Sequence, residues 1–355
     1  MRKKKTGFKE YKNMHHEFRP FMMFTNADNY QTSVVNTDKF GFRKTFYENK
    51  LIGLDEVKNI SSDHNVLLGG STAFSMGSPS DKKTISSYLS GMGDLCFSLG
   101  VRASTSQQEL ITYLLFKRFF GKIKNIVILS GVNDIALCAT KNSFYYPDFG
   151  GVYSEDMRFS QFWMQYNYFQ TEKWKVGRSN IYHLIHVLSN KFSFIRILLS
   201  LFSQKFLTNK SYLKLKKFNS LEFNDKIINL RKIISNDIET WSSITKSNSI
   251  NLIYIMQPLL NWSKKNMTTE EQNIIKDEKI RFDKDFYDHL TDIKTYKEHK
   301  AFLKKECEKN SVKFYDSNDW VAEAPSEDQF FIDQSHLTDY GNLYLSKKIN
   351  GILKK

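Results

Sequence analysis

A serine that follows two glycines is the first residue in this 355-residue chain whose setting suits chemistry. Ser71 comes directly after Gly69-Gly70, at the end of the apolar run 65–68. A serine hydroxyl becomes a nucleophile only when a base takes its proton and nearby donors accept the developing oxyanion. We expect backbone N–H groups to converge here, at a strand end close to a helix N-terminus. An ordinary turn with a helix cap explains the same residues equally well.

An asparagine stands in the matching place after a second strand-like run. The largely apolar segment 125–129 is followed by Ser130 and then by Gly131-Val132-Asn133-Asp134. The side-chain amide of Asn133 has N–H groups that can donate to an oxyanion. The alternative is a plain turn, because Gly, Asn and Asp favour turns.

A carboxylate and an imidazole lie three residues apart near the C-terminus. Asp333 and His336 precede a segment with helical spacing at 337–353, for which Thr338 or Asp339 is the candidate cap. A carboxylate in this position can orient the ring and select its tautomer. Alone, such a pair is more often a surface turn. Three short motifs in this order, each at a strand end or helix entry, favour a Ser-His-Asp site.

The elements that would position these residues follow an α/β pattern. Short apolar runs are separated by segments with helical spacing, of which 107–120 is the clearest; the runs are 65–68, 125–129, 250–256 and 312–315. Such strands predict a parallel sheet that is covered on both faces, a three-layer α/β/α sandwich. Active sites of these sheets lie at the carboxyl ends of the strands.

At this point the sequence resembles the SGNH, or GDSL-like, hydrolases, over most of the chain outside 137–245. The first block of that family is matched by 69–77 (GGSTAFSMG), the second by 99–104, the third by 131–134 and the fifth by 333–342. Two positions depart from the family pattern. Gly-Gly-Ser-Thr stands where the founding members have Gly-Asp-Ser-Leu, and no asparagine precedes the glycine of the second block.

The resemblance implies a role for each matched residue. Ser71 attacks an ester carbonyl, His336 takes its proton and later returns it to the leaving alcohol, and Asp333 holds His336. The oxyanion hole is formed by the N–H groups of Ser71 and Gly100 and by the side chain of Asn133. The resemblance also implies the SGNH, flavodoxin-like form of the α/β/α fold. The chemistry it implies needs no metal or organic cofactor.

Two further segments, 35–43 and 256–259, resemble members encoded with bacterial polysaccharide genes. We therefore expect a carbohydrate O-acetylesterase that acts through an acyl-serine, with an acylated carbohydrate or another small ester as substrate. Two alternatives stay open. One is an O-acetyltransferase that delivers the acyl group to a sugar hydroxyl, and the other is a catalytically idle scaffold of a polysaccharide assembly.

The domain organisation is predicted from changes in pattern along the chain. We expect an N-terminal extension at 1–60 that packs on the core, a hydrolase core formed by 61–136 and 246–355, and a largely helical insertion at 137–245. Aromatic residues crowd the insertion between 142 and 174. It acts either as a lid or substrate wall, or as a helical subdomain whose aromatics pack on one another.

Three side chains are candidates for substrate contact. Trp163 and Tyr146 belong to the aromatic stretch of the insertion, and Gln257 follows the apolar run 250–256. We expect no metal site. The pair His15-His16 lacks further ligands at suitable spacing, and His183 and His186 read as core or interface histidines.

The charge balance is basic, with 52 Lys and Arg against 38 Asp and Glu and a formal net charge of +14. This balance permits binding to nucleic acid, anionic lipid or an acidic sugar. We favour a lysine-rich surface that keeps the protein in solution. No phosphate-binding loop pattern is present and no nucleic-acid motif accompanies the basic residues, so we expect no nucleic-acid partner.

Cysteine use and apolar runs indicate the compartment. Cys96, Cys138 and Cys307 are few and far apart, which argues against a disulfide framework and fits a reducing compartment. The basic N-terminus has no apolar stretch after it, so no secretory signal is predicted. The most apolar segment, 181–202, is interrupted by polar and charged residues, so we expect no membrane span. A cytoplasmic protein is expected, with peripheral membrane contact as the minority alternative.

Overall fold

A five-stranded parallel sheet forms the centre of the computed structural model, which describes residues 8–140, 143–146, 151–154 and 221–354. The strands lie in the order β11 Lys313–Asp316, β10 Asn251–Met256, β7 Ile123–Ser130, β5 His64–Gly69 and β6 Cys96–Ser98. The four predicted strands are confirmed, each within two residues of its expected ends. The edge strand β6 was not predicted, because three residues are too few to show a pattern.

The sheet is buried on both faces, which explains its continuous apolar strands. In β5, Val66 and Leu68 belong to one buried cluster and Leu67 belongs to the other. In β7, Ile128 and Val127 divide between the same two clusters. Successive side chains of a strand point to opposite faces, so each cluster is the core on one side of the sheet.

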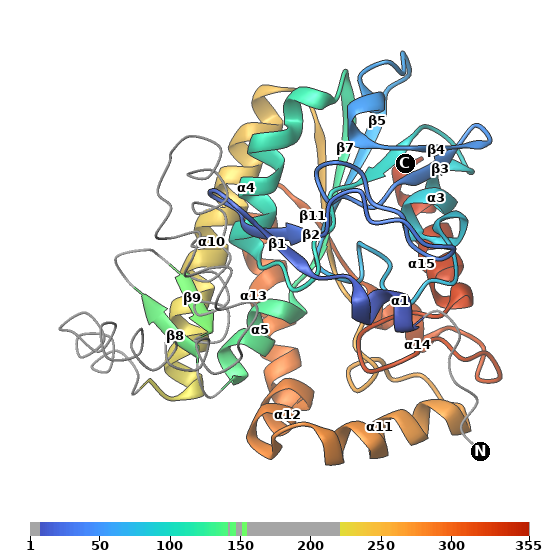
Figure 1. Ribbon diagram of the computed structural model, residues 1–355. Helices are drawn as coiled ribbons and strands as arrows, with labels where there is room; N and C mark the ends of the chain where they lie inside the picture. The colour runs from blue at the N-terminus through green and yellow to red at the C-terminus, as the bar shows by residue number, and fades with distance from the viewer. Residues whose placement is uncertain (1–7, 141–142, 147–150, 155–220, 355) are drawn as a thin grey trace, which may run out of the picture.

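Helices cover each face of the sheet, which gives the predicted α/β/α sandwich (Figure 1). The helices on one face are α4 Ser106–Phe116, α5 Val132–Ala139, α10 Phe223–Ser247 and α13 Ile293–Lys309. The helices on the other face are α3 Ile85–Ser90, α14 Ser317–Ala322 and α15 Asp339–Leu353. Two more, α11 Thr269–Arg281 and α12 Lys284–Thr291, run below the sheet in the view of Figure 1.

Helix ends follow the capping signals in the sequence. The hydroxyl of Thr338 accepts a hydrogen bond from the Gly341 N–H and caps α15. Thr268 caps α11 in a reciprocal box with Glu271. The predicted helix 107–120 ends earlier than expected, at Phe116, and a short 3₁₀ turn, η2 Lys117–Phe119, follows it.

Residues outside the central sheet form small antiparallel pairs and short helices. Those of the first 60 residues are α1 Phe8–Asn13, β1 His16–Arg19, β2 Met23–Asn26, β3 Thr45–Tyr47, β4 Lys50–Ile52 and α2 Leu54–Val57. Within the range expected to be an insertion, β8 Ser143–Tyr146 pairs with β9 Gly151–Ser154. The end of that range forms most of α10, which packs on α4, α5 and β10 and so belongs to a helical layer of the sandwich.

A buried arginine joins the N-terminal 60 residues to the loop after β5. The guanidinium of Arg43 donates from Nε to Asp81 Oδ1 at 2.7 Å, and from Nη1 to Tyr11 Oη and the Ser75 carbonyl, each at 2.8 Å. Its Nη2 donates to the Val34 carbonyl at 2.9 Å. The side chains of Arg43 and Asp81 are only 2% and 5% exposed, so removing one partner leaves a buried charge without compensation.

We therefore expect Arg43→Met and Asp81→Asn each to lower the free energy of unfolding by about 3–5 kcal/mol. Equilibrium unfolding in urea measures this. Lys39→Met is the matched control, because the Lys39–Asp55 pair is solvent-exposed and such pairs contribute at most about 1 kcal/mol. A stability of Arg43→Met within that margin of the unsubstituted protein would show that the buried pair does not brace the fold.

Candidate active site

Ser71 lies in a tight turn that starts where β5 ends. Gly69 has φ of 147°, and a Cβ there would lie 2.1 Å from the Leu129 carbonyl oxygen on β7, so only glycine fits. The Met76 N–H donates to the Ser71 carbonyl at 2.9 Å and closes the turn. The expected helix N-terminus beside Ser71 is not there. Residues 71–77 form successive turns, in which the N–H groups of Phe74, Ser75 and Met76 bond carbonyls four, three and five residues back rather than at one helical spacing.

Ser71, His336 and Asp333 form one hydrogen-bonded chain. His336 Nε2 lies 2.7 Å from Ser71 Oγ, and His336 Nδ1 lies 2.7 Å from Asp333 Oδ2. The side chains come from distant parts of the sequence, since Ser71 and His336 are separated by 265 positions. The structure thus brings together the three residues that the sequence motifs selected.

A short closed loop presents the acid and the imidazole. Asp333 Oδ1 accepts the N–H groups of Ser335 at 3.0 Å and His336 at 2.8 Å. The Ile332 N–H donates to the His336 carbonyl at 2.9 Å. The Thr72 hydroxyl donates to the Ser335 carbonyl at 3.1 Å, so the residue after Ser71 also touches this loop. The carboxylate therefore fixes both its own loop and the imidazole ring.

Charges at the site oppose the effect of burial. Burial alone lowers the pKa of His336, but the charge of Asp333 and its hydrogen bond outweigh this, so the pKa is raised above 6.5. Burial raises the pKa of Asp333, while the charge of His336 and three hydrogen bonds lower it to about 2. Asp333 is thus ionised at neutral pH and holds the ring with Nδ1–H toward it.

Asn133 reaches the same edge from the neighbouring strand. It is the second residue of α5, directly after β7, and its Nδ2 donates to the Ser104 carbonyl at 2.8 Å. A Cβ on Gly70 would lie 2.2 Å from this nitrogen, so the amide lies against the backbone just before Ser71. The amide nitrogen has a second hydrogen, which is available to a bound group.

The predicted oxyanion donor Gly100 requires a correction. Its N–H donates to the Ser98 hydroxyl at 3.1 Å, and a Cβ on Gly100 would lie 2.5 Å from the Phe74 nitrogen, so the backbone of residues 73–74 packs directly against it. Three residues later, Ala103 adopts φ of 61°, which is unusual for alanine. Among the described residues the N–H groups of Ala103 and Ser71 have no hydrogen-bond acceptor. Ala103 directly precedes Ser104, to which Asn133 is bonded, so it is the better candidate.

The N-terminal hairpin holds the loop that carries Ala103. Asn26 Oδ1 accepts the Arg102 N–H at 3.2 Å and Arg102 Nε at 3.0 Å. Asn26 Nδ2 donates to the carbonyls of Gly41 at 3.0 Å and Gly100 at 3.4 Å. Arg102 Nη2 donates further to the Met14 carbonyl at 2.7 Å. The backbone around Ala103 is therefore tied to residues 14–41, a connection that no motif in the sequence indicated.

The candidate substrate contacts are only partly placed. Gln257 follows β10 at the carboxyl edge, where its N–H donates to the Ser130 carbonyl at 2.9 Å, and it is buried. Trp163, His183, His186 and the segment 181–202 lie outside the described residues, as does the side chain of Tyr146. A contact of Gln257 with substrate thus stays a prediction.

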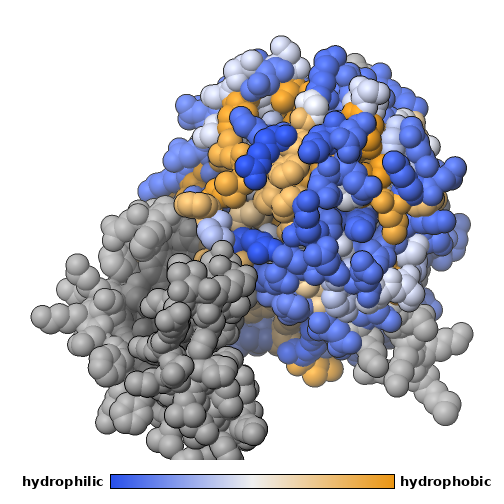
Figure 2. Space-filling view, turned by 45° about the horizontal axis from the view of Figure 1, so that its top comes forward, coloured by the Kyte–Doolittle hydropathy of each residue, from blue (hydrophilic) through white to orange (hydrophobic). Residues whose placement is uncertain are grey.

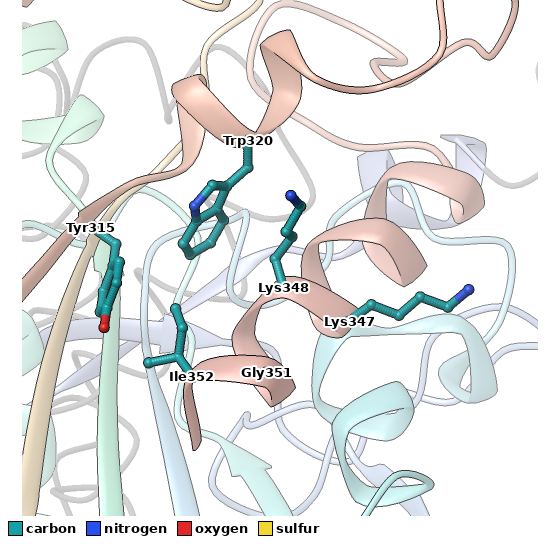
Figure 3. A pocket seen from close by; sticks show the side chains of 6 residues that line it. All are labelled: Tyr315, Trp320, Lys347, Lys348, Gly351 and Ile352. Atoms are coloured by element: carbon teal, nitrogen blue, oxygen red, sulfur yellow. The ribbon is translucent and has the colours of Figure 1, made fainter. Parts of the chain in front are cut away.

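One surface hollow lies well away from the triad. Its volume is about 350 Å³, and it is lined by Tyr315, Trp320, Lys347, Lys348, Gly351 and Ile352 (Figure 3). The last two residues lie near the end of α15, whereas His336 lies just before its start. At 1.5 Å per residue, the helix separates the two by about 20 Å. This hollow therefore takes no part in the chemistry of Ser71.

In the part of the chain that the structure describes, no three His, Cys, Asp or Glu side chains gather as metal ligands would. None of its helices combines the length and apolar character needed to cross a bilayer. The three cysteines are buried and unpaired. Figure 2 shows a mostly hydrophilic face interrupted by apolar patches.

Because the Asp333 carboxylate raises the pKa of His336, we expect Asp333→Asn to lower it, as burial then acts without its main opposing charge. Titration of the His336 ring by NMR measures this, with the signal assigned from a His336→Gln variant. Asp63→Asn, at a surface position, is the control. An unchanged ring titration in Asp333→Asn would show that the 2.7 Å contact does not set the charge of the imidazole.

Comparisons with known proteins find similarity in structure but not in sequence. No family model matches the chain, and no curated protein matches it in sequence. Among solved structures, the chain is similar to the acetyl xylan esterase AlAXEase, with a TM-score of 0.38 and 10% sequence identity. The alignment covers 81% of this chain and 98% of that one.

Proposed function

We propose that this protein is a serine ester hydrolase that removes O-acyl groups, above all O-acetyl groups, from a carbohydrate. The observation that carries the proposal is the continuous chain from Ser71 Oγ through His336 to Asp333, with both contacts at 2.7 Å. An imidazole whose other nitrogen is held by a carboxylate is what a serine needs to become a nucleophile.

The proposed reaction has two halves. Ser71 Oγ attacks the acyl carbonyl while His336 Nε2 takes the hydroxyl proton, and the imidazolium then passes this proton to the leaving sugar oxygen. An acyl-serine and a free sugar hydroxyl result. In the second half, water attacks the acyl-serine, His336 takes the proton of the water and returns it to Ser71, and a carboxylic acid leaves.

Three donors are available for the oxyanion of each tetrahedral intermediate. They are the backbone N–H groups of Ser71 and Ala103 and the second hydrogen of Asn133 Nδ2. Donors that are held in place before the reaction stabilise the developing charge without reorganisation. The Ser104 carbonyl holds the amide of Asn133, and Asn26 holds the backbone next to Ala103, so both are fixed in advance.

Carbohydrate is the proposed substrate class because of the segments 35–43 and 256–259, which resemble polysaccharide-linked members of the SGNH hydrolases. Both segments lie near the site. Arg43 donates to the Ser75 carbonyl in the turn 71–77 that carries Ser71, here called the nucleophile turn, and Gln257 follows β10 at the carboxyl edge. The same acyl-serine would serve an O-acetyltransferase if a sugar hydroxyl intercepts it before water does.

The first test is the loss of the nucleophile. Ser71→Ala should lower the rate of 4-nitrophenyl acetate hydrolysis at least about 10⁴-fold, because the remaining groups have no acyl acceptor to activate. Mass spectrometry after treatment with a fluorophosphonate should place the label on Ser71 of the unsubstituted protein. The matched control is Ser335→Ala, a serine of the loop between Asp333 and His336 that should keep its activity. Labelling elsewhere, or full activity of Ser71→Ala, would overturn the proposal.

Substrate class and acyl acceptor need a separate measurement. Acetate release from acetylated xylan and from acetylated acidic glycans, with and without an added acceptor sugar, separates hydrolysis from transfer. Acetylated acceptor in the products would favour the transferase, and acetate alone would favour the esterase. Activity on 4-nitrophenyl acetate without release from any glycan would leave the esterase chemistry but remove the carbohydrate assignment.

The oxyanion donors give a second prediction. Asn133→Ala should lower kcat by about 10²–10³-fold, the usual cost of one such donor. Asn133→Asp should lower kcat at least as much, since it replaces the N–H donors with a negatively charged carboxylate on a side chain of the same size. Gly70→Ala should act in the same direction, because the new Cβ would lie 2.2 Å from Asn133 Nδ2 and would push the amide away. Activities of all three variants within a factor of three of the unsubstituted protein would exclude Asn133 from the hole.

A further inference from the structure

Helix α11 reaches the loop of Asp333 and His336 with two carboxylates. Glu271 and Glu278 lie seven residues apart, which puts them two turns apart on one face of the helix. Glu271 Oε1 accepts the N–H groups of Phe330 at 2.7 Å and Phe331 at 3.1 Å. Glu278 Oε1 accepts the Gln334 N–H at 3.2 Å. The helix is therefore bonded to the loop both before and within the stretch from Asp333 to His336.

Gln334, the residue that follows Asp333, is held from several sides. Its carbonyl accepts the Leu260 N–H at 2.8 Å, and its side-chain Nε2 donates to Asn261 Oδ1 at 3.3 Å. The bond from its N–H to Glu278 completes this set. A change at Glu278 therefore acts one residue away from the carboxylate that orients His336.

The two glutamates differ in how their charge is compensated. Glu271 is fully buried, and its Oε2 lies 3.1 Å from the ammonium of Lys265. Glu278 is 7% exposed, and its Oε2 is buried without a hydrogen-bond partner among the described residues. A buried carboxylate without a bonded cation is costly, and a neutral glutamine would make the same bond to Gln334. A purely structural contact thus does not account for a glutamate at this position.

We propose that Glu278 is a positioning residue for the Asp333–His336 pair, which holds the loop through the Gln334 N–H and acts on His336 through its charge. This inference rests on the proposed function, because it concerns the same triad. Glu278 makes no contact with Ser71 Oγ and takes no proton from it. Its role is to keep the geometry and to favour the protonated form of the imidazole.

The charged groups around Glu278 make its own state depend on pH. Burial and the charge of Asp333 raise its pKa to about 7, against the Gln334 N–H and the charges of Arg281 and His336, which lower it. Tyr287 of α12 also faces it, and the charge of Glu278 helps raise the pKa of that phenol. The charge of Glu278 also raises the pKa of His336, so the protonation of each group affects the other.

The protonation state of His336 sets how activity depends on pH. The imidazole must be neutral to take a proton from Ser71, so kcat/KM rises with pH as His336 loses its proton. In Glu278→Gln the charge is gone and the acceptor for Gln334 is kept. The acid limb of the pH profile should therefore move to lower pH by roughly half a unit or more, with little change in the high-pH plateau. Glu278→Asp keeps the charge with a shorter arm, so it should lower the plateau and move the limb less.

The control is Glu270→Gln, which removes an exposed charge from the same helix and should leave the limb in place. Titration of the His336 ring by NMR gives the same answer without turnover, so it separates this inference from the proposed function. In the unsubstituted protein, ¹³C NMR should show the Glu278 carboxyl titrating near pH 7, even if the variants fail to fold. An unmoved His336 titration in Glu278→Gln, or a Glu278 carboxyl that titrates at its ordinary value, would overturn the proposal.

Discussion

The site depends on one constraint, namely that the polar backbone of a partly buried loop must find partners as it delivers His336 to Ser71. A loop withdrawn from water cannot leave its N–H and carbonyl groups unpaired. Here the partners come from four directions. They are the Asp333 carboxylate within the loop, the hydroxyl of Thr72 in the nucleophile turn, the backbone after β10, and the glutamates of α11. Because each partner belongs to a different element, the 2.7 Å contact between His336 and Ser71 forms only when the whole carboxyl edge is assembled.

A second set of buried carboxyls lies in the helical layer that carries Asn133. Glu109 of α4, Asp134 of α5 and Asp237 of α10 each have a raised pKa, mainly because of burial. Asp134 accepts hydrogen bonds from both the N–H and the hydroxyl of Ser106, at the start of α4. The start of α5 is thus tied to the start of α4, just where Asn133 bonds the Ser104 carbonyl. These bonds fix Asn133 and the backbone of Ser104 relative to each other.

The sequence predicted what depends on local pattern and missed what depends on close approach. Apolar runs ending in glycine located the main strands, and the motifs after them selected the residues that meet in the triad, together with Asn133. Gly100 was named as a donor because the resemblance to the SGNH hydrolases implied it, yet its N–H meets the Ser98 hydroxyl, and it is Ala103 that takes the positive φ. Glu278 reads as one more charge on a polar helix, since its burial arises only when the loop 330–336 folds onto α11. The short strand β6 and the N-terminal hairpin carry too few residues for a periodic signal.

The N-terminal 60 residues are part of the site rather than an addition to it. Two buried arginines show this from opposite sides of the junction. Arg43 comes from the N-terminal part and donates to the carbonyls of the nucleophile turn, while Arg102 comes from the loop after β6 and donates to carbonyls at the N-terminus. Each guanidinium is buried, so it stays in place only while carbonyls or carboxylates from the other side surround it. If either side moved away, a poorly compensated charge would remain beside the Ser75 carbonyl or next to Ala103. The same junction therefore holds both the turn that carries Ser71 and the loop that carries Ala103.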